Sequence, residues 1–180
     1  EVCDRLADAD RPIDLLDNNA GFGLRAKFLD NDLLNEEAGL DVMVRAVMLT
    51  CHAAGRAMRQ RGRGAIVNVS SVASFIANGT YSAENAFVTV FTEGLASELH
   101  GTGVTATVLC PGFTRTEFHA RADIKISALP ESLWLDADDV VEHYRAIRAG
   151  GGHGFLLFEG GLLAGDADFR GVAKGAAEFA

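Results

Sequence analysis

Three polar side chains in the middle of the sequence have the types and the spacing for acid–base chemistry on an oxygen atom. Tyr81 opens a helix that is expected over residues 81–100, and Asn85 follows it by one turn on the same face. Ser71 ends a short apolar run just before that helix. A hydroxyl group beside a phenol can polarise a carbonyl and move a proton to or from its oxygen. These residues form a candidate catalytic group, although a Tyr and a Ser near a turn are more often structural.

Strands that alternate with helices would position this group. Short apolar runs predict buried strands, because the strands of a parallel sheet covered on both faces are apolar almost throughout. These runs are residues 13–17, 65–69, 104–109 and 155–158. Apolar residues at spacings of three and four predict the helices. The helices are expected at residues 2–9, about 31–60, 81–100 and 136–149, with Gly39 as a point of division in the second. This order predicts an α/β fold with a doubly wound parallel sheet and a single domain.

Three polar segments come directly after predicted strands. They are Asn18–Gly21, Ser70–Ser71 and Cys110–Thr116. In an open parallel sheet, ligands bind where the carboxyl ends of the strands meet. We therefore expect these segments to surround one crevice. Residues 113–135 are expected to be irregular.

Four short motifs follow one another in the order of a known enzyme family. They are NNAG at 18–21, VNVSS at 67–71, YSAEN at 81–85 and PGFTRT at 111–116. With these motifs the sequence resembles the short-chain dehydrogenase/reductase family over roughly residues 1–150. The resemblance implies a Rossmann-type fold and an NAD(P)-dependent oxidoreductase that interconverts a small-molecule alcohol and a carbonyl.

The resemblance also implies roles for individual residues. Tyr81 corresponds to the general acid or base, and Ser71 to the residue that holds the substrate oxygen. The segment with His119 and Trp134 corresponds to the substrate lid. Two further sets correspond to cofactor-binding residues: Asn18, Asn19, Ala20 and Gly21 in the first motif, and Pro111, Gly112 and Thr116 in the last.

The sequence departs from the family pattern at the third catalytic position. Asn85 stands where the Y-x-x-x-K pattern of the family has a Lys, which binds the nicotinamide ribose and lowers the pKa of the Tyr. A phenol with a pKa near 10 is ionised to only about one part in a thousand at pH 7. An Asn side chain can bind a ribose hydroxyl, but it carries no charge that would lower this pKa.

Two further departures concern Met43 and Asp17. Met43 stands where many relatives carry an Asn that completes a proton relay. Asp17 lies in a strand where relatives carry a Val-like residue, and a buried carboxylate there would cost several kcal/mol without a partner or water. We expect this strand to lie at the edge of the sheet, where Asp17 is tolerated.

The glycine-rich turn with which the family holds the cofactor pyrophosphate, T-G-x-x-x-G-x-G, is not found before Ile13. Residues 1–158 are therefore expected to be the C-terminal two-thirds of a Rossmann-type domain that is truncated at its N-terminus, and residues 159–180 a weakly patterned tail. NAD or NADP is expected to bind this chain weakly. The G-x-G-x-x-A pattern at 21–26 is not a substitute, because a loop and not a helix follows it.

Composition excludes several other classes of function. A net charge of -9 argues against a nucleic-acid partner, since such proteins concentrate Lys and Arg on one face. The apolar runs are too short to span a membrane. The five His residues are scattered, so no metal site is expected. Cys3, Cys51 and Cys110 are too few for a disulfide framework, and they indicate a reducing compartment, which we take to be the cytoplasm.

Two functions remain open. The first is the oxidoreductase, with Tyr81, Ser71 and Asn85 at its catalytic centre. The second is a catalytically inactive relative that serves as a scaffold or interaction protein. In both cases a homo-oligomer is expected, because the helices at 31–60 and 81–100 carry apolar residues beyond one stripe. The substrate, the choice between NAD and NADP and the reaction direction stay open.

Overall fold

A five-stranded sheet forms the centre of the computed structural model, which describes residues 1–24, 26–118, 131–149, 154–159 and 162–165. In the order β1-β2-β3-β6-β7, its strands are Leu15–Asn18, Gly64–Val69, Val104–Pro111, Gly154–Glu159 and Leu162–Gly165. The first four run parallel, and β7 runs antiparallel to β6. The predicted parallel α/β sheet is confirmed. Strand β7 was not predicted, and it lies within residues 159–180, where the sequence is weakly patterned.

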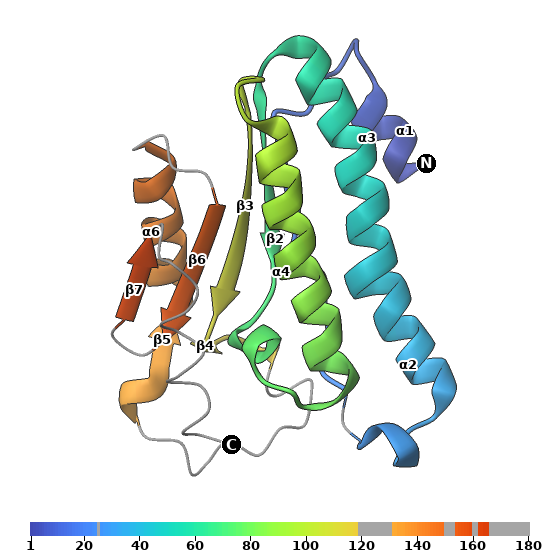
Figure 1. Ribbon diagram of the computed structural model, residues 1–180, viewed down its shortest axis with the longest axis vertical. Helices are drawn as coiled ribbons and strands as arrows, with labels where there is room; N and C mark the ends of the chain where they lie inside the picture. The colour runs from blue at the N-terminus through green and yellow to red at the C-terminus, as the bar shows by residue number, and fades with distance from the viewer. Residues whose placement is uncertain (25, 119–130, 150–153, 160–161, 166–180) are drawn as a thin grey trace.

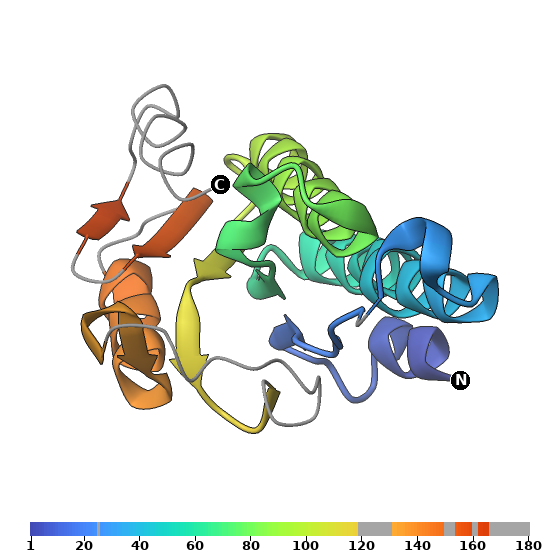
Figure 2. The same cartoon turned by 90° about the horizontal axis from the view of Figure 1, so that it is seen from below.

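Helices cover both faces of the sheet (Figure 1). Helices α1 (Val2–Ala7), α3 (Ala46–Arg61) and α4 (Gly79–Leu99) lie on one face, and α6 (Ala137–Ala149) lies on the other, as the view from below shows (Figure 2). Alternate side chains of β2 point to the two faces of the sheet. Ile66 packs in the core under α3 and α4, and Val67 packs with Val140 of α6. Within the described residues, no helix has the length and apolar character needed to cross a lipid bilayer.

The helix predicted over residues 31–60 is not divided into two helices at Gly39, because the backbone of Gly39 and Leu40 is helical; only the hydrogen-bond pattern changes there. Helix α2 (Leu33–Gly39) begins at Asp32, whose side chain accepts the N–H of Leu34. A π-helical segment (Leu40–Arg45) follows, and the N–H of Ala46 donates to the oxygen of Asp41, five residues earlier. Helix α3 continues from there. Because π turns occur frequently at functional sites, a functional site is expected close to this segment.

Strand β1 lies at the edge of the described sheet, which confirms the position predicted for Asp17. The Asp17 side chain is exposed there, although partial burial still raises its pKa. In the described residues the carboxylate therefore keeps contact with water.

The segment expected to be irregular contains two short strands and a turn of helix. Strands β4 (Phe113–Arg115) and β5 (Trp134–Asp136) pair in parallel, and a 3₁₀ turn (Glu131–Leu133) precedes β5. Arg115 forms ion pairs with Glu131 and Asp136, and its guanidinium lies 5.2 Å from the centre of the Trp134 ring. The prediction of an irregular segment was wrong at these positions, because the pairing joins residues about 20 apart. Residues 119–130, with His119 of the expected lid, lie outside the described residues.

Candidate active site

The carboxyl ends of β1, β2 and β3 meet at one edge of the sheet. Asn18 pairs with Asn68 and Val69 with Leu109 in parallel register. The segments that follow these strands therefore start side by side. This arrangement agrees with the crevice that the sequence predicted.

Tyr81, Ser71 and Asn85 come together at this edge. Tyr81 lies in the first turn of α4, and the side chains of Ser71 and Asn85 lie near enough to its hydroxyl to lower its pKa. Ser71 is held in place because its hydroxyl accepts the N–H of Ala73 at 3.1 Å and caps the short helix η3 (Val72–Phe75). Asn85 is buried, and its Nδ2 donates to the backbone oxygen of Tyr81 at 2.8 Å. The structure thus assembles the three predicted side chains, whose catalytic roles stay predictions.

Burial raises the pKa of the Tyr81 hydroxyl above its ordinary value of 10, because the phenolate would lose its hydration. The nearby side chains of Ser71 and Asn85 lower the pKa, and the negative charge of Glu84 raises it. Tyr81 is therefore a neutral phenol at pH 7, which can donate a proton to a substrate oxygen. The uncharged Asn85 lowers this pKa, but not by enough to offset the effect of burial.

A pocket of about 910 Å³ lies beside this group, a volume suited to a small ligand. Its walls come from the turn after β1, from the start of α2 and from the segment after β4. The lining residues are Asn19, Gly21, Phe22, Gly23, Leu24, Asn31, Asn35, Thr116, Glu117 and Phe118. The pocket therefore joins the two segments predicted to contact the cofactor. Ala20, Pro111 and Gly112, which were predicted with them, do not line it.

Two side chains connect the pocket to its surroundings. The Phe118 ring, in the pocket wall, lies 6.2 Å from the ring of Tyr81 between centroids. Met43, in the π-helical segment, lies behind the turn after β1, because a Cβ atom on Gly21 would be 3.3 Å from its Sδ. Met43 thus packs against the pocket wall, and its thioether cannot relay a proton as an Asn amide could.

Asn18, the first residue of the NNAG motif, faces the interior. Its Nδ2 donates to Oδ1 of Asn68 at 2.8 Å, and Nδ2 of Asn68 donates to Oγ1 of Thr92 at 2.8 Å. Asn68 is completely buried, so these bonds offset the cost of its desolvation. Asn18 therefore ties β1 to β2 and α4, and its predicted contact with a cofactor stays a prediction.

Cys110 lies at the same sheet edge but is poorly suited to act as a nucleophile. Burial raises the pKa of its thiol to about 11, and the pKa of the Cys51 thiol likewise. Both thiols are protonated at pH 7, and the thiolate is the reactive form. In the described part of the chain, no three His, Cys, Asp or Glu residues are grouped as a metal site would require.

Several residues at this site were not predicted from the sequence. Asn31 and Asn35 line the pocket from the start of α2, and Glu84 is buried beside Asn85. Glu84 had a signal in the sequence, since it lies four residues before Val88 on the buried stripe of α4. Asn31 and Asn35 had none, because their approach to Thr116 depends on the loop between β1 and α2.

Known proteins of similar sequence are oxidoreductases. The family model described as short chain dehydrogenase matches residues 1–126. Sulfoacetaldehyde reductase 2 of Chromohalobacter salexigens is 34% identical over 151 residues, which cover 78% of this chain and 60% of that protein. Galactitol 2-dehydrogenase (L-tagatose-forming) of Cereibacter sphaeroides is 34% identical over 137 residues, 72% of this chain and 52% of that protein. The chain thus spans about half the length of these curated relatives.

Solved structures share the fold. A short-chain dehydrogenase from Sphingobium yanoikuyae in complex with NADPH has a TM-score of 0.82 at 28% identity, with 99% of this chain and 67% of that chain covered. A gluconate 5-dehydrogenase from Burkholderia cenocepacia in complex with NADP and tartrate has a TM-score of 0.77 at 27% identity, with 89% and 68% covered. The predicted Rossmann-type fold is confirmed by these likenesses.

Proposed function

We propose that this chain, which belongs to the short-chain dehydrogenase family, carries the catalytic group of an NAD- or NADP-dependent oxidoreductase that interconverts an alcohol and a carbonyl. The observation that carries the proposal is that the Tyr81 hydroxyl and the Ser71 side chain lie close together at the carboxyl edge of the sheet. A pocket of suitable size lies next to it. The family membership supports the reaction type.

In this proposal Tyr81 and Ser71 act on the substrate oxygen. The Ser71 hydroxyl donates a hydrogen bond to the carbonyl oxygen and holds it beside Tyr81. As a neutral phenol, Tyr81 donates a proton to that oxygen as the carbonyl is reduced. At neutral pH Tyr81 is in the protonated form that carbonyl reduction needs, whereas oxidation of the alcohol needs the phenolate as a base.

The residues present fit the nicotinamide end of a cofactor. Asn19 and Thr116 place polar groups on the pocket wall, and Gly21 allows the turn to pack closely against Met43 behind it. NADH or NADPH, when bound, supplies the hydride. Asn85 replaces the Lys of the family, and we expect it to hold a ribose hydroxyl only weakly. Binding of the cofactor to these 180 residues alone is expected to be weak.

The substrate is proposed only as a small-molecule alcohol or carbonyl. The names of the two relatives given above refer to a sulfonated aldehyde and to a sugar alcohol, so they agree on the reaction and not on the substrate. A homo-oligomer is proposed because α2, α3 and α4 expose apolar side chains, with Leu34 70% and Val90 68% exposed. A reducing compartment such as the cytoplasm is supported by three free cysteines.

The test is the change in nicotinamide absorbance when the protein is mixed with a panel of small ketones and alcohols. Tyr81→Phe is expected to lower turnover by about 10²–10⁴-fold, the usual contribution of a general acid. Tyr144→Phe is the matched control, because Tyr144 lies on α6 and its buried hydroxyl has no hydrogen-bond partner among the described residues. An inactive protein would favour the alternative of an inactive scaffold that retained the fold. Equal activity of the two variants would show that Tyr81 is not the general acid.

A further inference from the structure

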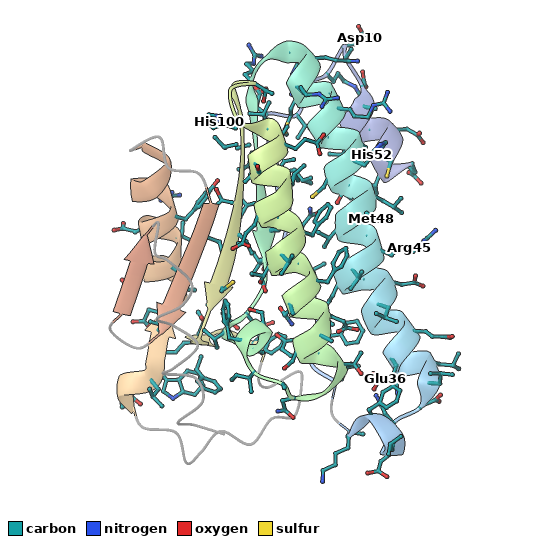
Figure 3. The ribbon with its side chains drawn as sticks, in the orientation of Figure 1. Asp10, Glu36, Arg45, Met48, His52 and His100 are labelled. Atoms are coloured by element: carbon teal, nitrogen blue, oxygen red, sulfur yellow. The ribbon has the colours of Figure 1, made fainter. Side chains whose placement is uncertain are left out.

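Two glutamates meet in the interior between α2 and α4, outside the catalytic group. Glu36 is 3% exposed and Glu84 is 1% exposed. Figure 3 shows Glu36 where α2 approaches the lower end of α4. Among the described residues, both oxygens of Glu84 and Oε2 of Glu36 have no hydrogen-bond partner, while Glu36 Oε1 accepts Nδ2 of Asn31 at 2.5 Å. Three of the four carboxyl oxygens are thus buried and unpaired.

Gly39 makes room for this pair. A Cβ atom on Gly39 would lie 3.2 Å from the carboxyl carbon of Glu84 and closer still to Oε1. The backbone of Gly39 is helical, so the residue is not required there for its torsion angles. The carboxyl group of Glu84 therefore packs directly against the backbone of α2, one turn from Glu36.

Within the part of the chain that the structure describes, no Lys or Arg forms an ion pair with Glu36 or Glu84. The other charged residues of α2 and of the π-helical segment, Glu37, Asp41 and Arg45, are exposed to solvent, and η3 has no charged residue. On α4, the negative charge of Glu84 raises the pKa of Tyr81. Two ionised carboxylates in this position would be buried without compensation, at a cost of several kcal/mol per ion.

We propose that Glu36 and Glu84 share one proton, and that the pair is a positioning device that holds Asn31 in the wall of the pocket. The Glu84 carboxylic acid donates its proton to Glu36, and the ionised Glu36 accepts the amide of Asn31. Asn35, which also lines the pocket, donates to Oδ1 of Asn31 at 3.4 Å. In this proposal, a chain of hydrogen bonds runs from Glu84, on the buried face of α4, to Asn31 and Asn35 in the pocket wall.

The electrostatics agree with this arrangement. Burial raises the pKa of Glu84 to about 7, and the charge of Glu36 acts in the same direction. Between pH 4.5 and about 7 the folded protein holds a proton that the unfolded chain has lost. Stability therefore falls as pH rises through this range and is constant above it. At higher pH both groups are charged, their repulsion separates α2 from α4, and Asn31 loses its position.

The test compares the wild type with Glu84→Gln, whose amide can donate to Glu36 at every pH. Denaturant unfolding of both proteins is measured from pH 4.5 to 8.5. Across this range, the folding equilibrium constant of the wild type is expected to fall by up to about 300-fold relative to that of Glu84→Gln. This ratio corresponds to a Glu84 pKa of about 7 in the folded protein and 4.5 in the unfolded chain. Glu37→Gln, on the exposed side of α2, is the control and should follow the wild type.

A second readout rests on the proposed function. In the active protein, KM is expected to rise above pH 7 in the wild type and to stay constant in Glu84→Gln, with kcat changed little in either. If the protein has no activity, the unfolding measurement still decides the proposal. Parallel unfolding curves for the wild type and Glu84→Gln would overturn it. So would stabilisation of the wild type by Mg²⁺ that is absent in Glu84→Gln, because the carboxylates would then hold a cation and not a proton.

Discussion

Replacing Gly39 with Ala should destabilise the protein, although the same change normally stabilises a helix. Glycine in the middle of a helix costs about 0.5–1 kcal/mol relative to Ala, because it loses more backbone freedom on folding. Gly39 is helical and ends α2, so that gain is available. The new methyl group, however, would press into the carboxyl group of Glu84.

The magnitude follows from how closely Glu84 is held. Its side chain is 1% exposed and cannot swing into solvent without opening the contact between α2 and α4. Extra atoms in a packed interior cost about 1–3 kcal/mol. We therefore expect Gly39→Ala to lower the free energy of unfolding by about 1–2 kcal/mol after the helical gain is subtracted. In a Glu84→Ala background the methyl group has space, and the same substitution should stabilise by about 0.5–1 kcal/mol.

The assay is denaturant unfolding followed by circular dichroism, with Gly94→Ala as the matched control. Gly94 also lies in a helix, but a Cβ atom there would meet nothing within 4 Å. It should therefore show the full helical gain of about 0.5–1 kcal/mol in both backgrounds. If Gly39→Ala stabilises the wild type as much as Gly94→Ala does, Glu84 moves freely and the packing argument is refuted.

Two further substitutions test the catalytic group and the apolar helix face. Asn85→Lys should lower the pKa of Tyr81 by about two units, because a charge at about 5 Å in an effective dielectric near 20 is worth about 3 kcal/mol. Spectroscopic titration of the phenol, with Tyr81→Phe as the blank, measures the shift; an unchanged pKa would show that the ammonium does not reach the hydroxyl. Val90→Glu should weaken self-association about 100-fold or more, since each copy loses a buried Val worth about 1.5–3 kcal/mol. Light scattering measures this, and Val141→Glu, an exposed site on α6, should leave the mass unchanged.

The sequence predicted the elements whose signals are local. Strands β2 and β3 are continuous apolar runs, and α4 carries an apolar stripe, so their positions agree within about two residues with the structure. The meeting of Ser71 with Tyr81 followed from the rule that parallel strands end at one edge. These predictions needed only periodicity and the order of the elements.

The features that the sequence did not predict depend on partners far away in the chain. Glu36 and Glu84 are 48 residues apart, and nothing in either segment reveals that they share a buried space. Strands β4 and β5 are three residues each, too short for a periodic signal. Gly39 was expected to divide the helix, but its backbone stays helical, and the π-helical hydrogen bonds after it had no signal in the sequence.

The π-helical segment also sets a rotational phase. Each residue advances an α-helix by about 100°, and a π turn accommodates one residue more than an α turn. Residues before Leu40 are therefore rotated about the helix axis relative to an uninterrupted continuation of α3. A deletion of one residue within Asp41–Val44 would let the helix run straight, and it would turn Glu36 away from α4 by roughly a quarter of a circle. The contact between the pocket wall and the buried face of α4 therefore depends on one extra residue in the π-helical segment, which lies between these two parts in the chain.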